Sequence, residues 1–201
     1  AYTKADGYEY SAYTLLRHSF GVVKGAAKPM EKRSDLLMLC DDSVNEDMLK
    51  LGNLIGFSGI RYGASWGSNV INNGFHVGEN SFDWQRTDSQ INVINKYGFK
   101  NVIACVLNTP VWAARSDIEN EYNVVGNYYA NCSMPTKLSY ITEGFGAFAE
   151  RYADDLNGIE VWNEPYFNKY AYWHDGAENF ALLAQTAYNA VKNSDSDMTV
   201  Y

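Results

Sequence analysis

Two polar residues, Asn163 and Glu164, directly follow a short apolar segment, residues 158–162. The segment is rich in β-branched and aromatic side chains, and Pro165 after it has no N–H to continue a ladder, so the pattern predicts a short buried strand that ends at the polar pair. A carboxyl group can transfer protons and a carboxamide can hydrogen-bond a ligand, so the pair is a candidate functional site. The alternative interpretation of Glu164 is a solvated carboxylate at a strand end.

Helical and extended patterns alternate along the rest of the chain and define the elements that must position this pair. Ser43, with Glu46 three residues later, predicts the N-cap and capping box of the first helix. The first strand is either residues 19–24 or residues 35–40, and residues 67–86 predict a polar loop. Helices are expected at residues 43–55, 88–97, 138–152 and 175–191, and further strands at residues 59–62, 100–107, 158–162 and 198–201. The expected apolar face of the first helix consists of Met48, Leu51, Leu54 and Ile55.

Strands that alternate with helices predict βαβ units, with right-handed crossovers and a parallel sheet. The chain contains four such units and the start of a fifth. The expected fold class is α/β, and an apolar strand that ends in polar residues is typical of a TIM (β/α)8 barrel, whose active sites lie at the carboxyl ends of the strands. We expect residues 1–18 to be an N-terminal arm or the tail of a preceding module, and residues 19–201 to be the N-terminal half of such a barrel.

The composition of the 201-residue chain excludes several kinds of partner. The chain is 46% hydrophobic and 20% charged, which is ordinary for a globular domain. A net charge of −8 argues against a nucleic-acid partner, and no apolar run approaches the roughly 20 residues that span a bilayer, so no membrane partner is expected either. Aromatic residues make up 15%, which suits a site that stacks on sugar rings, although aromatic residues also fill cores.

The sequence contains three cysteines. Cys105 lies in an apolar run and predicts a buried thiol, whereas Cys40 and Cys132 could pair, which the sequence does not decide. No Cys or His spacing suggests a metal site, and we expect no cofactor.

Four stretches of the chain resemble motifs of the clan A glycoside hydrolases. The resemblance covers roughly residues 19–201 and is nearest to family 39, the β-xylosidase and iduronidase group. The stretches are Gly-Ile-Arg-Tyr at residues 59–62, Ser-Phe-Asp-Trp at residues 81–84, Thr-Pro-Val-Trp-Ala at residues 109–113 and Glu-Val-Trp-Asn-Glu-Pro at residues 160–165. The last motif is specific for the clan, and the other three support it by their order and spacing.

The resemblance implies a retaining hydrolase of β-linked glycans or glycosides. Glu164 corresponds to the general acid/base of the clan, and Asn163 to the amide that donates a hydrogen bond to the sugar 2-hydroxyl. Arg61 corresponds to an arginine beside the nucleophile, and its alternative role is an ion pair at the surface or the barrel bottom. Glu160 is expected to face the barrel interior, but it comes before the acid/base along the strand and therefore lies too deep in the barrel to act as the second carboxylate.

Aromatic residues near the expected strand ends are candidates for sugar binding. Trp112 and Trp173 are candidate stacking platforms, although either could belong to the core, and Trp66 is a weaker candidate of the same kind. His174 could line the site or could be a solvated or capping residue.

One feature departs from the clan pattern, because clan A enzymes take the nucleophilic glutamate from the seventh strand and this sequence reaches only the fifth. A full barrel takes about 250 residues. We therefore expect either a fragment of a longer protein, which we favour, or a half-barrel that cannot carry out the two-carboxylate reaction alone. The expected partners are an oligosaccharide or polysaccharide and the C-terminal half of the barrel, and the expected location is extracellular. The alternative functions are a non-catalytic carbohydrate-binding half-barrel and a structural α/β domain.

Overall fold

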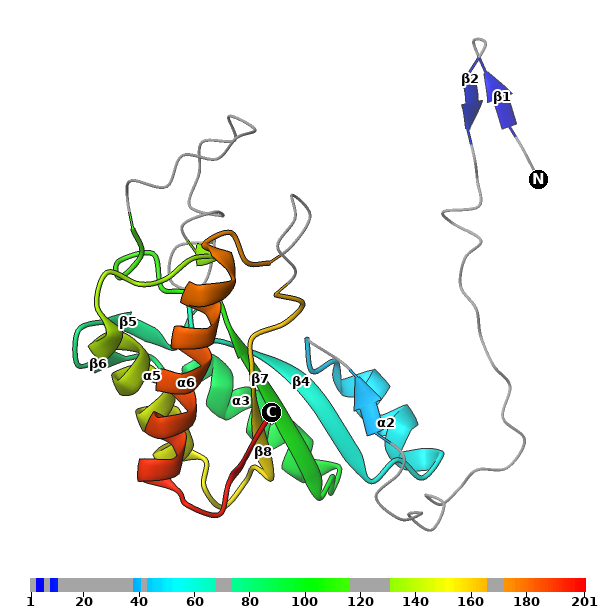
Figure 1. The fold of residues 1–201 in the computed structure, drawn as a ribbon. Coiled ribbons are helices and arrows are strands. Elements are labelled where there is room, and N and C mark those ends of the chain that lie inside the picture. The colour runs from blue at the N-terminus through cyan, green and yellow to red at the C-terminus, as the bar shows by residue number, and fades with distance from the viewer. Residues whose placement is uncertain are drawn as a thin grey trace.

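The computed structural model of the protein describes residues 3–5, 8–10, 38–40, 43–67, 74–115, 131–165 and 172–201 (Figure 1). The elements in chain order are β1 (Thr3–Ala5), β2 (Tyr8–Tyr10), β3 (Met38–Cys40), α2 (Glu46–Leu54), β4 (Gly59–Ser65), β5 (His76–Gly78), β6 (Ser81–Phe82), α3 (Gln85–Lys96), β7 (Asn101–Leu107), α5 (Leu138–Arg151), β8 (Gly158–Val161), α6 (Gly176–Ser194) and β9 (Thr199–Val200).

The central sheet has five parallel strands in the order β3-β4-β7-β8-β9. Strands that are adjacent in the sheet also follow one another along the chain, and helices lie in the connections between them, as in the wall of a (β/α) barrel. This confirms the predicted parallel sheet of a partial barrel. β3 lies within the second of the two candidate first strands, and residues 19–24 lie outside the described part of the chain.

Each central strand turns one face toward the helices. The buried residues of β4 and β7 alternate with residues that are partly exposed, because successive side chains of a strand point to opposite faces. The face toward the helices carries Ile60, Tyr62, Ala64, Val102, Ala104 and Val106, all buried. Arg61 and Gly63 lie on the opposite face, which corresponds to the inside of the barrel.

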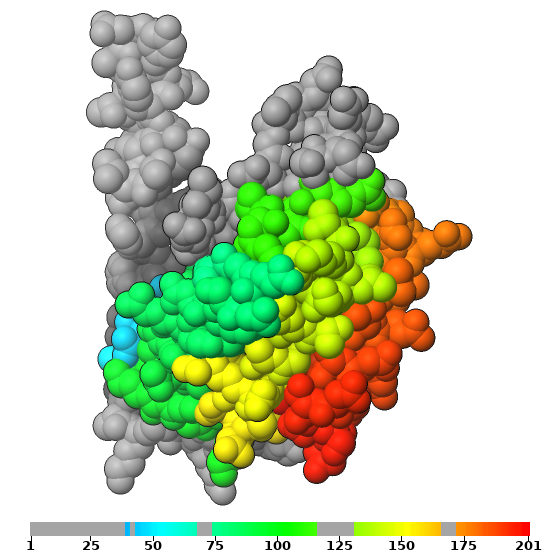
Figure 2. All heavy atoms as spheres, turned by 90° about the vertical axis from the view of Figure 1, so that its left-hand side faces the viewer, coloured from blue at the N-terminus to red at the C-terminus, as the bar shows by residue number. Residues whose placement is uncertain are grey.

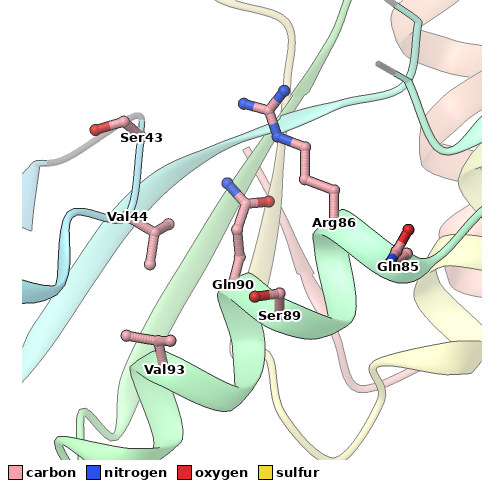
Figure 3. A pocket seen from close by; sticks show the side chains of 7 residues that line it. All are labelled: Ser43, Val44, Gln85, Arg86, Ser89, Gln90 and Val93. Atoms are coloured by element: carbon pink, nitrogen blue, oxygen red, sulfur yellow. The ribbon is translucent and has the colours of Figure 1, made fainter. Parts of the chain in front are cut away.

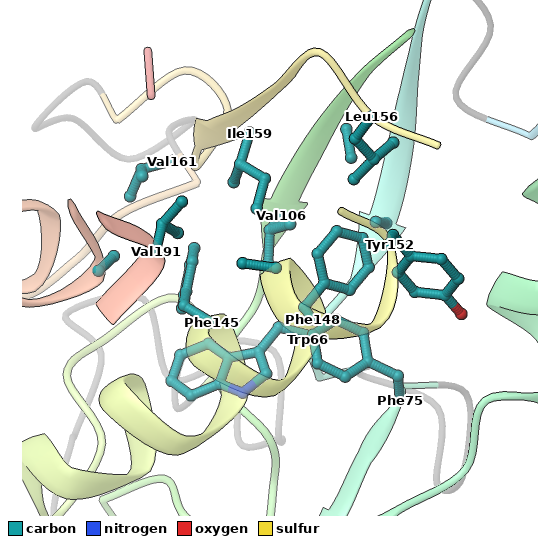
Figure 4. Close-up of a cluster of buried hydrophobic side chains, with 14 of the residues drawn as sticks. Trp66, Phe75, Val106, Phe145, Phe148, Tyr152, Leu156, Ile159, Val161 and Val191 are labelled. Atoms are coloured by element: carbon teal, nitrogen blue, oxygen red, sulfur yellow. The ribbon is translucent and has the colours of Figure 1, made fainter. Parts of the chain in front are cut away.

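Aromatic side chains dominate the core between the sheet and its helices (Figure 4). Trp66 meets Phe145 edge to face at 5.5 Å between ring centroids, and Phe75 stacks on Phe148 at 5.0 Å. Figure 2 shows the outside of this layer, where the surface runs from the β5–β6 hairpin across α5 to α6. The predicted helix at residues 138–152 is confirmed, although Leu138, expected on its buried face, is 42% exposed.

The start and the buried face of α2 differ from the prediction. Asn45, not Ser43, caps the helix, because its side chain accepts hydrogen bonds from the backbone N–H of Asp47 and Met48 at 3.0 and 3.2 Å. Of the predicted face, Met48, Leu51 and Ile55 are exposed, and the buried residues of α2 are Leu49 and Gly52. A Cβ at Gly52 would be in ordinary van der Waals contact with Leu39 of β3 and with Phe99, so this side of α2 is the one that lies against the sheet.

Two hairpins form separate two-stranded sheets. β1 and β2 pair antiparallel, with Thr3 opposite Tyr10, inside the region predicted as an arm. The proposed division at residues 18 and 19 lies outside the described residues and remains a prediction. β5 and β6 also pair antiparallel, inside the segment predicted to be a polar loop. None of the helices in the described ranges combines the length and the apolar character of a membrane span.

None of the three cysteines forms a disulfide; Cys40 is exposed, whereas Cys105 and Cys132 are buried. Burial raises the pKa of the Cys132 thiol to about 12, so little reactive thiolate forms there. We expect an aromatic disulfide reagent to modify Cys40 rapidly in the native protein and all three thiols after denaturation. If only one thiol reacts after denaturation, Cys40 and Cys132 are instead joined in a disulfide.

Candidate active site

The backbone at the end of β8 adopts a conformation that is rare for residues other than glycine. Trp162 has a φ of +74° and Glu164 a φ of +46°, both in the left-handed region. Neighbouring strands hold this turn, because the Trp162 N–H donates to the Val106 carbonyl at 2.9 Å and the Cys105 thiol donates to the Trp162 carbonyl at 3.2 Å. The Trp162 indole N–H donates to the Tyr172 carbonyl at 2.8 Å. Strain of this kind costs about 1–3 kcal/mol per residue and clusters at functional sites.

Glu164 is exposed and lines a hollow of about 530 Å³. Most of the wall is apolar and comes from β8, β9 and the face of α6 beside them. The lining residues are Glu160, Val161, Trp162, Glu164, Pro165, Phe180, Ala184, Tyr188, Val200 and Tyr201. Glu164 is therefore a solvent-accessible carboxyl group at the edge of this hollow.

Arg61, Glu160 and Asn163 form one hydrogen-bonded cluster on the inner face of the sheet. Arg61 Nε donates to Glu160 Oε2 at 2.6 Å, and Arg61 Nη2 donates to Glu160 Oε1 at 2.8 Å and to Asn163 Oδ1 at 2.8 Å. These bonds to Glu160 raise the pKa of the Arg61 guanidinium further, so it stays charged. Arg61 therefore forms an ion pair with Glu160 on the inner face of the sheet, not at the surface or the barrel bottom, and the same guanidinium also reaches the predicted substrate-binding amide. The position of Arg61 relative to a nucleophile remains a prediction.

Two of the predicted sugar platforms are core residues. Trp66 and Trp173 are fully buried, and their indole N–H groups donate inside the protein, to His76 Nδ1 at 2.9 Å and to the Gly176 carbonyl at 2.7 Å. A ring with no exposed face cannot stack on a sugar, so these two predictions are corrected. Each ring is buried by neighbours that the sequence does not place beside it, such as Phe145 against Trp66.

Trp112 and His174 keep part of their surface exposed. The Trp112 indole N–H donates to the His76 carbonyl at 2.8 Å, and its ring meets Tyr140 edge to face at 4.7 Å. The backbone N–H of His174 donates to the Cys132 carbonyl at 2.8 Å. Sugar binding by Trp112 and His174 remains a prediction.

His76 has a specific environment that sequence reasoning missed. Its ring is fully buried, stacks on Phe82 at 4.8 Å, accepts the Trp66 indole N–H at Nδ1 and has Nε2 3.0 Å from Glu143 Oε1. Because Nδ1 is an acceptor, the proton of the neutral ring is on Nε2 and is donated to Glu143. Burial lowers the pKa of His76, and the Glu143 carboxylate opposes part of that shift. The only signal in the sequence was the density of aromatic residues around position 76.

We expect this histidine to make the fold sensitive to mild acid. The folded pKa of His76 lies below its unfolded value of about 6.5, so its contribution to stability is complete above that value and is lost as the pH falls toward the folded pKa. Chemical denaturation between pH 7.5 and 5 measures the free energy of unfolding. As the pH falls, this group should lower that free energy by an amount that approaches about 1.4 kcal/mol per pH unit. His76→Gln, which can still accept from Trp66 and donate to Glu143, should show a flatter profile. If the free energy of unfolding falls with pH at the same rate in the wild type and in His76→Gln, His76 is not the source of the acid sensitivity.

A second hollow, of about 370 Å³, lies outside the sheet at the start of α3 (Figure 3). Ser43 and Val44 line one side, and Gln85, Arg86, Ser89, Gln90 and Val93 line the other. The Gln90 side chain donates to the Gly63 carbonyl at 3.3 Å and so links α3 to β4. This hollow shares no lining residue with the one at Glu164. Within the described ranges, no cluster of three or more His, Cys, Asp or Glu residues could hold a metal ion.

Known proteins resemble the chain in family and in fold. The family model described as Cellulase (glycosyl hydrolase family 5) matches residues 26–201, and no curated protein sequence matches significantly. A family 39 glycoside hydrolase from Bacteroides cellulosilyticus WH2 is 17% identical over 82% of this chain, with a TM-score of 0.53. A glucosidase from Croceicoccus marinus is 13% identical over 87% of the chain, with a TM-score of 0.63. A family 30 subfamily 8 xylanase from Clostridium acetobutylicum is 15% identical over 88% of the chain, with a TM-score of 0.54.

The chain spans only part of these three structures, namely 30%, 38% and 43% of their lengths. At such low identities the likeness shows the fold alone. The shared fold is the (β/α) barrel wall described above, with Asn163 and Glu164 at the carboxyl end of its fourth strand.

Proposed function

We propose, because this chain belongs to the cellulase family (glycosyl hydrolase family 5), that it hydrolyses β-linked glycans with retention of configuration and that Glu164 is its general acid/base. The membership in clan A that the motifs predicted is confirmed, and the family whose model matches is family 5. The assignment of Glu164 rests on one observation above the others. It is an exposed carboxylate at the carboxyl end of a barrel strand, on a strained turn that three hydrogen bonds hold in place.

In this mechanism Glu164 acts twice. Its protonated carboxyl group gives a proton to the departing glycosidic oxygen, and its carboxylate then takes a proton from the water that completes hydrolysis. Asn163 donates a hydrogen bond from its amide to the sugar 2-hydroxyl, a contact that strengthens in the transition state.

The second carboxylate of a retaining enzyme lies about 5–5.5 Å from the first. Glu160 is not proposed for this role, because both of its oxygens accept hydrogen bonds from Arg61. We propose that the nucleophile comes from outside residues 38–201, either from further residues of the same protein or from a second chain that completes the barrel. A polymeric substrate does not cross a membrane, so we also propose that the enzyme acts outside the cell.

The test is the configuration of the first product that the full-length protein forms. Proton NMR during hydrolysis of an aryl β-glycoside distinguishes the two anomers before they equilibrate. The proposal predicts that the β-anomer appears first, and initial release of the α-anomer would exclude a retaining mechanism. Binding of an oligosaccharide without turnover would favour the carbohydrate-binding alternative.

A further inference from the structure

We propose that Glu160 is a positioning residue that acts through Arg61 to fix the orientation of the Asn163 amide, so that its nitrogen and not its oxygen faces the sugar. The inference rests on the proposed function of Asn163 and concerns the residues that make this contact possible. Glu160 itself touches no substrate in this account.

The chemistry of Arg61 determines which atom of Asn163 lies beside it. A guanidinium group has five N–H donors and no acceptor, so the Asn163 atom 2.8 Å from Arg61 Nη2 must be the amide oxygen. The two N–H groups of Asn163 then remain for other partners. An amide held in this way presents donors to a ligand, and a hydroxyl group can accept from it.

Glu160 is the group that holds the guanidinium in this orientation. Its two oxygens accept from Nε and Nη2 of Arg61, a bidentate pair that fixes the plane of the guanidinium as a single hydrogen bond does not. Nη2 carries two N–H groups, and the second is the one that reaches Asn163. Without the carboxylate, the Arg61 side chain can rotate and the amide of Asn163 can flip.

The sheet leaves room for this contact across two strands. Arg61 is in β4 and Glu160 is in β8, with β7 between them. The residues level with Glu160 are Cys105 in β7 and Gly63 in β4, which are both small. Arg61 can therefore reach the level of Glu160 and extend to Asn163, which lies beyond the strained residue Trp162.

The consequence is that selectivity for a sugar with a 2-hydroxyl depends on Glu160. In the full-length protein, kcat/KM should be measured for an aryl β-glycoside and for its 2-deoxy analogue, in the wild type and in Glu160→Gln. We expect Glu160→Gln to lower kcat/KM for the parent glycoside by about tenfold or more and to leave the 2-deoxy substrate nearly unchanged. Arg61→Lys removes the planar guanidinium group with its paired N–H donors. It should also lower the ratio of kcat/KM for the parent glycoside to kcat/KM for the 2-deoxy analogue.

A matched control separates positioning from general destabilisation. Asp88 accepts a similar bidentate pair from Arg151, at 3.0 and 2.7 Å, on the outer surface of the protein. Asp88→Asn should leave the ratio between the two substrates unchanged. If Glu160→Gln leaves the ratio of the two kcat/KM values unchanged, whether or not both values fall, the inference is overturned and Glu160 has a purely structural role.

A second readout does not require catalysis. In protein labelled with ¹⁵N, the side-chain amide resonances of Asn163 should move in Glu160→Gln and stay in place in Asp88→Asn. A wild type that hydrolyses neither substrate, together with resonances that move, would refute the proposed function and keep the positioning role. Resonances that do not move would refute the positioning role, whatever the activity.

Discussion

Replacement of Glu164 with glutamine is expected to lower kcat on a glycoside with a poor leaving group by about 10²–10⁴-fold, while substrate affinity stays within a few fold. The amide has the shape of the carboxyl group, so the hollow beside it keeps its form, but it neither gives a proton to the leaving oxygen nor takes one from water. Glycosides whose leaving group departs without protonation should lose much less in the first step. Steady-state kinetics with a series of leaving groups in the full-length protein measure this difference.

The matched control is Glu178→Gln, because Glu178 is an exposed carboxylate in the first turn of α6 and does not line the hollow. This variant should retain wild-type kinetics throughout the series. The assignment of Glu164 fails if Glu164→Gln hydrolyses unactivated glycosides at the wild-type rate.

A second large effect is expected from Gly144→Ala in α5. A Cβ at this position would lie 2.2 Å from Trp66 Nε1, which cannot move away easily because its N–H donates to His76 inside the core. Overpacking of this kind typically costs 1–3 kcal/mol and occasionally more, so we expect a loss of about 3 kcal/mol or a failure to fold. Urea denaturation followed by tryptophan fluorescence gives the free energy of unfolding.

Gly146→Ala, two residues along the same helix, is the control. The nearest atom to a Cβ there is the Ser194 hydroxyl oxygen at 3.3 Å, at the end of a mobile side chain, so alanine should be accommodated. The higher helix propensity of alanine should then stabilise the protein by up to about 1 kcal/mol. Equal stabilities of the two variants would contradict the packing of α5 on Trp66.

The sequence allowed the prediction of features that depend on local patterns. The strand of residues 158–162 and its polar pair were recognisable because an apolar β-branched run, a proline and two polar residues occur together. The order of helices and strands predicted the parallel sheet, because a crossover connection imposes that geometry regardless of which side chains meet. These features placed Glu164 at the carboxyl end of a strand before any contact was known.

Features that depend on contacts between distant residues could not be predicted in the same way. Glu160 was expected to face the barrel interior, but its partner Arg61 is 99 positions away in the chain. The burial of Trp66 depends on α5 and on the β5–β6 hairpin, which the polar composition of residues 67–86 concealed. The buried face of α2 was predicted wrongly for a related reason, because the side of the helix that packs, with Leu49 and Gly52, is set by contacts with distant residues such as Phe99.

The most direct test of the central claim is chemical rescue of Glu164→Ala in the full-length protein by azide, with an activated aryl β-glycoside as substrate. Removal of the acid/base side chain leaves space on the face where water would attack, and azide needs no general base. The account predicts faster turnover with azide and a glycosyl azide of β configuration, the same as the substrate. A glycosyl azide of α configuration would identify Glu164 as the nucleophile instead, and a lack of rescue with unchanged hydrolysis would show that Glu164 takes no part in the reaction.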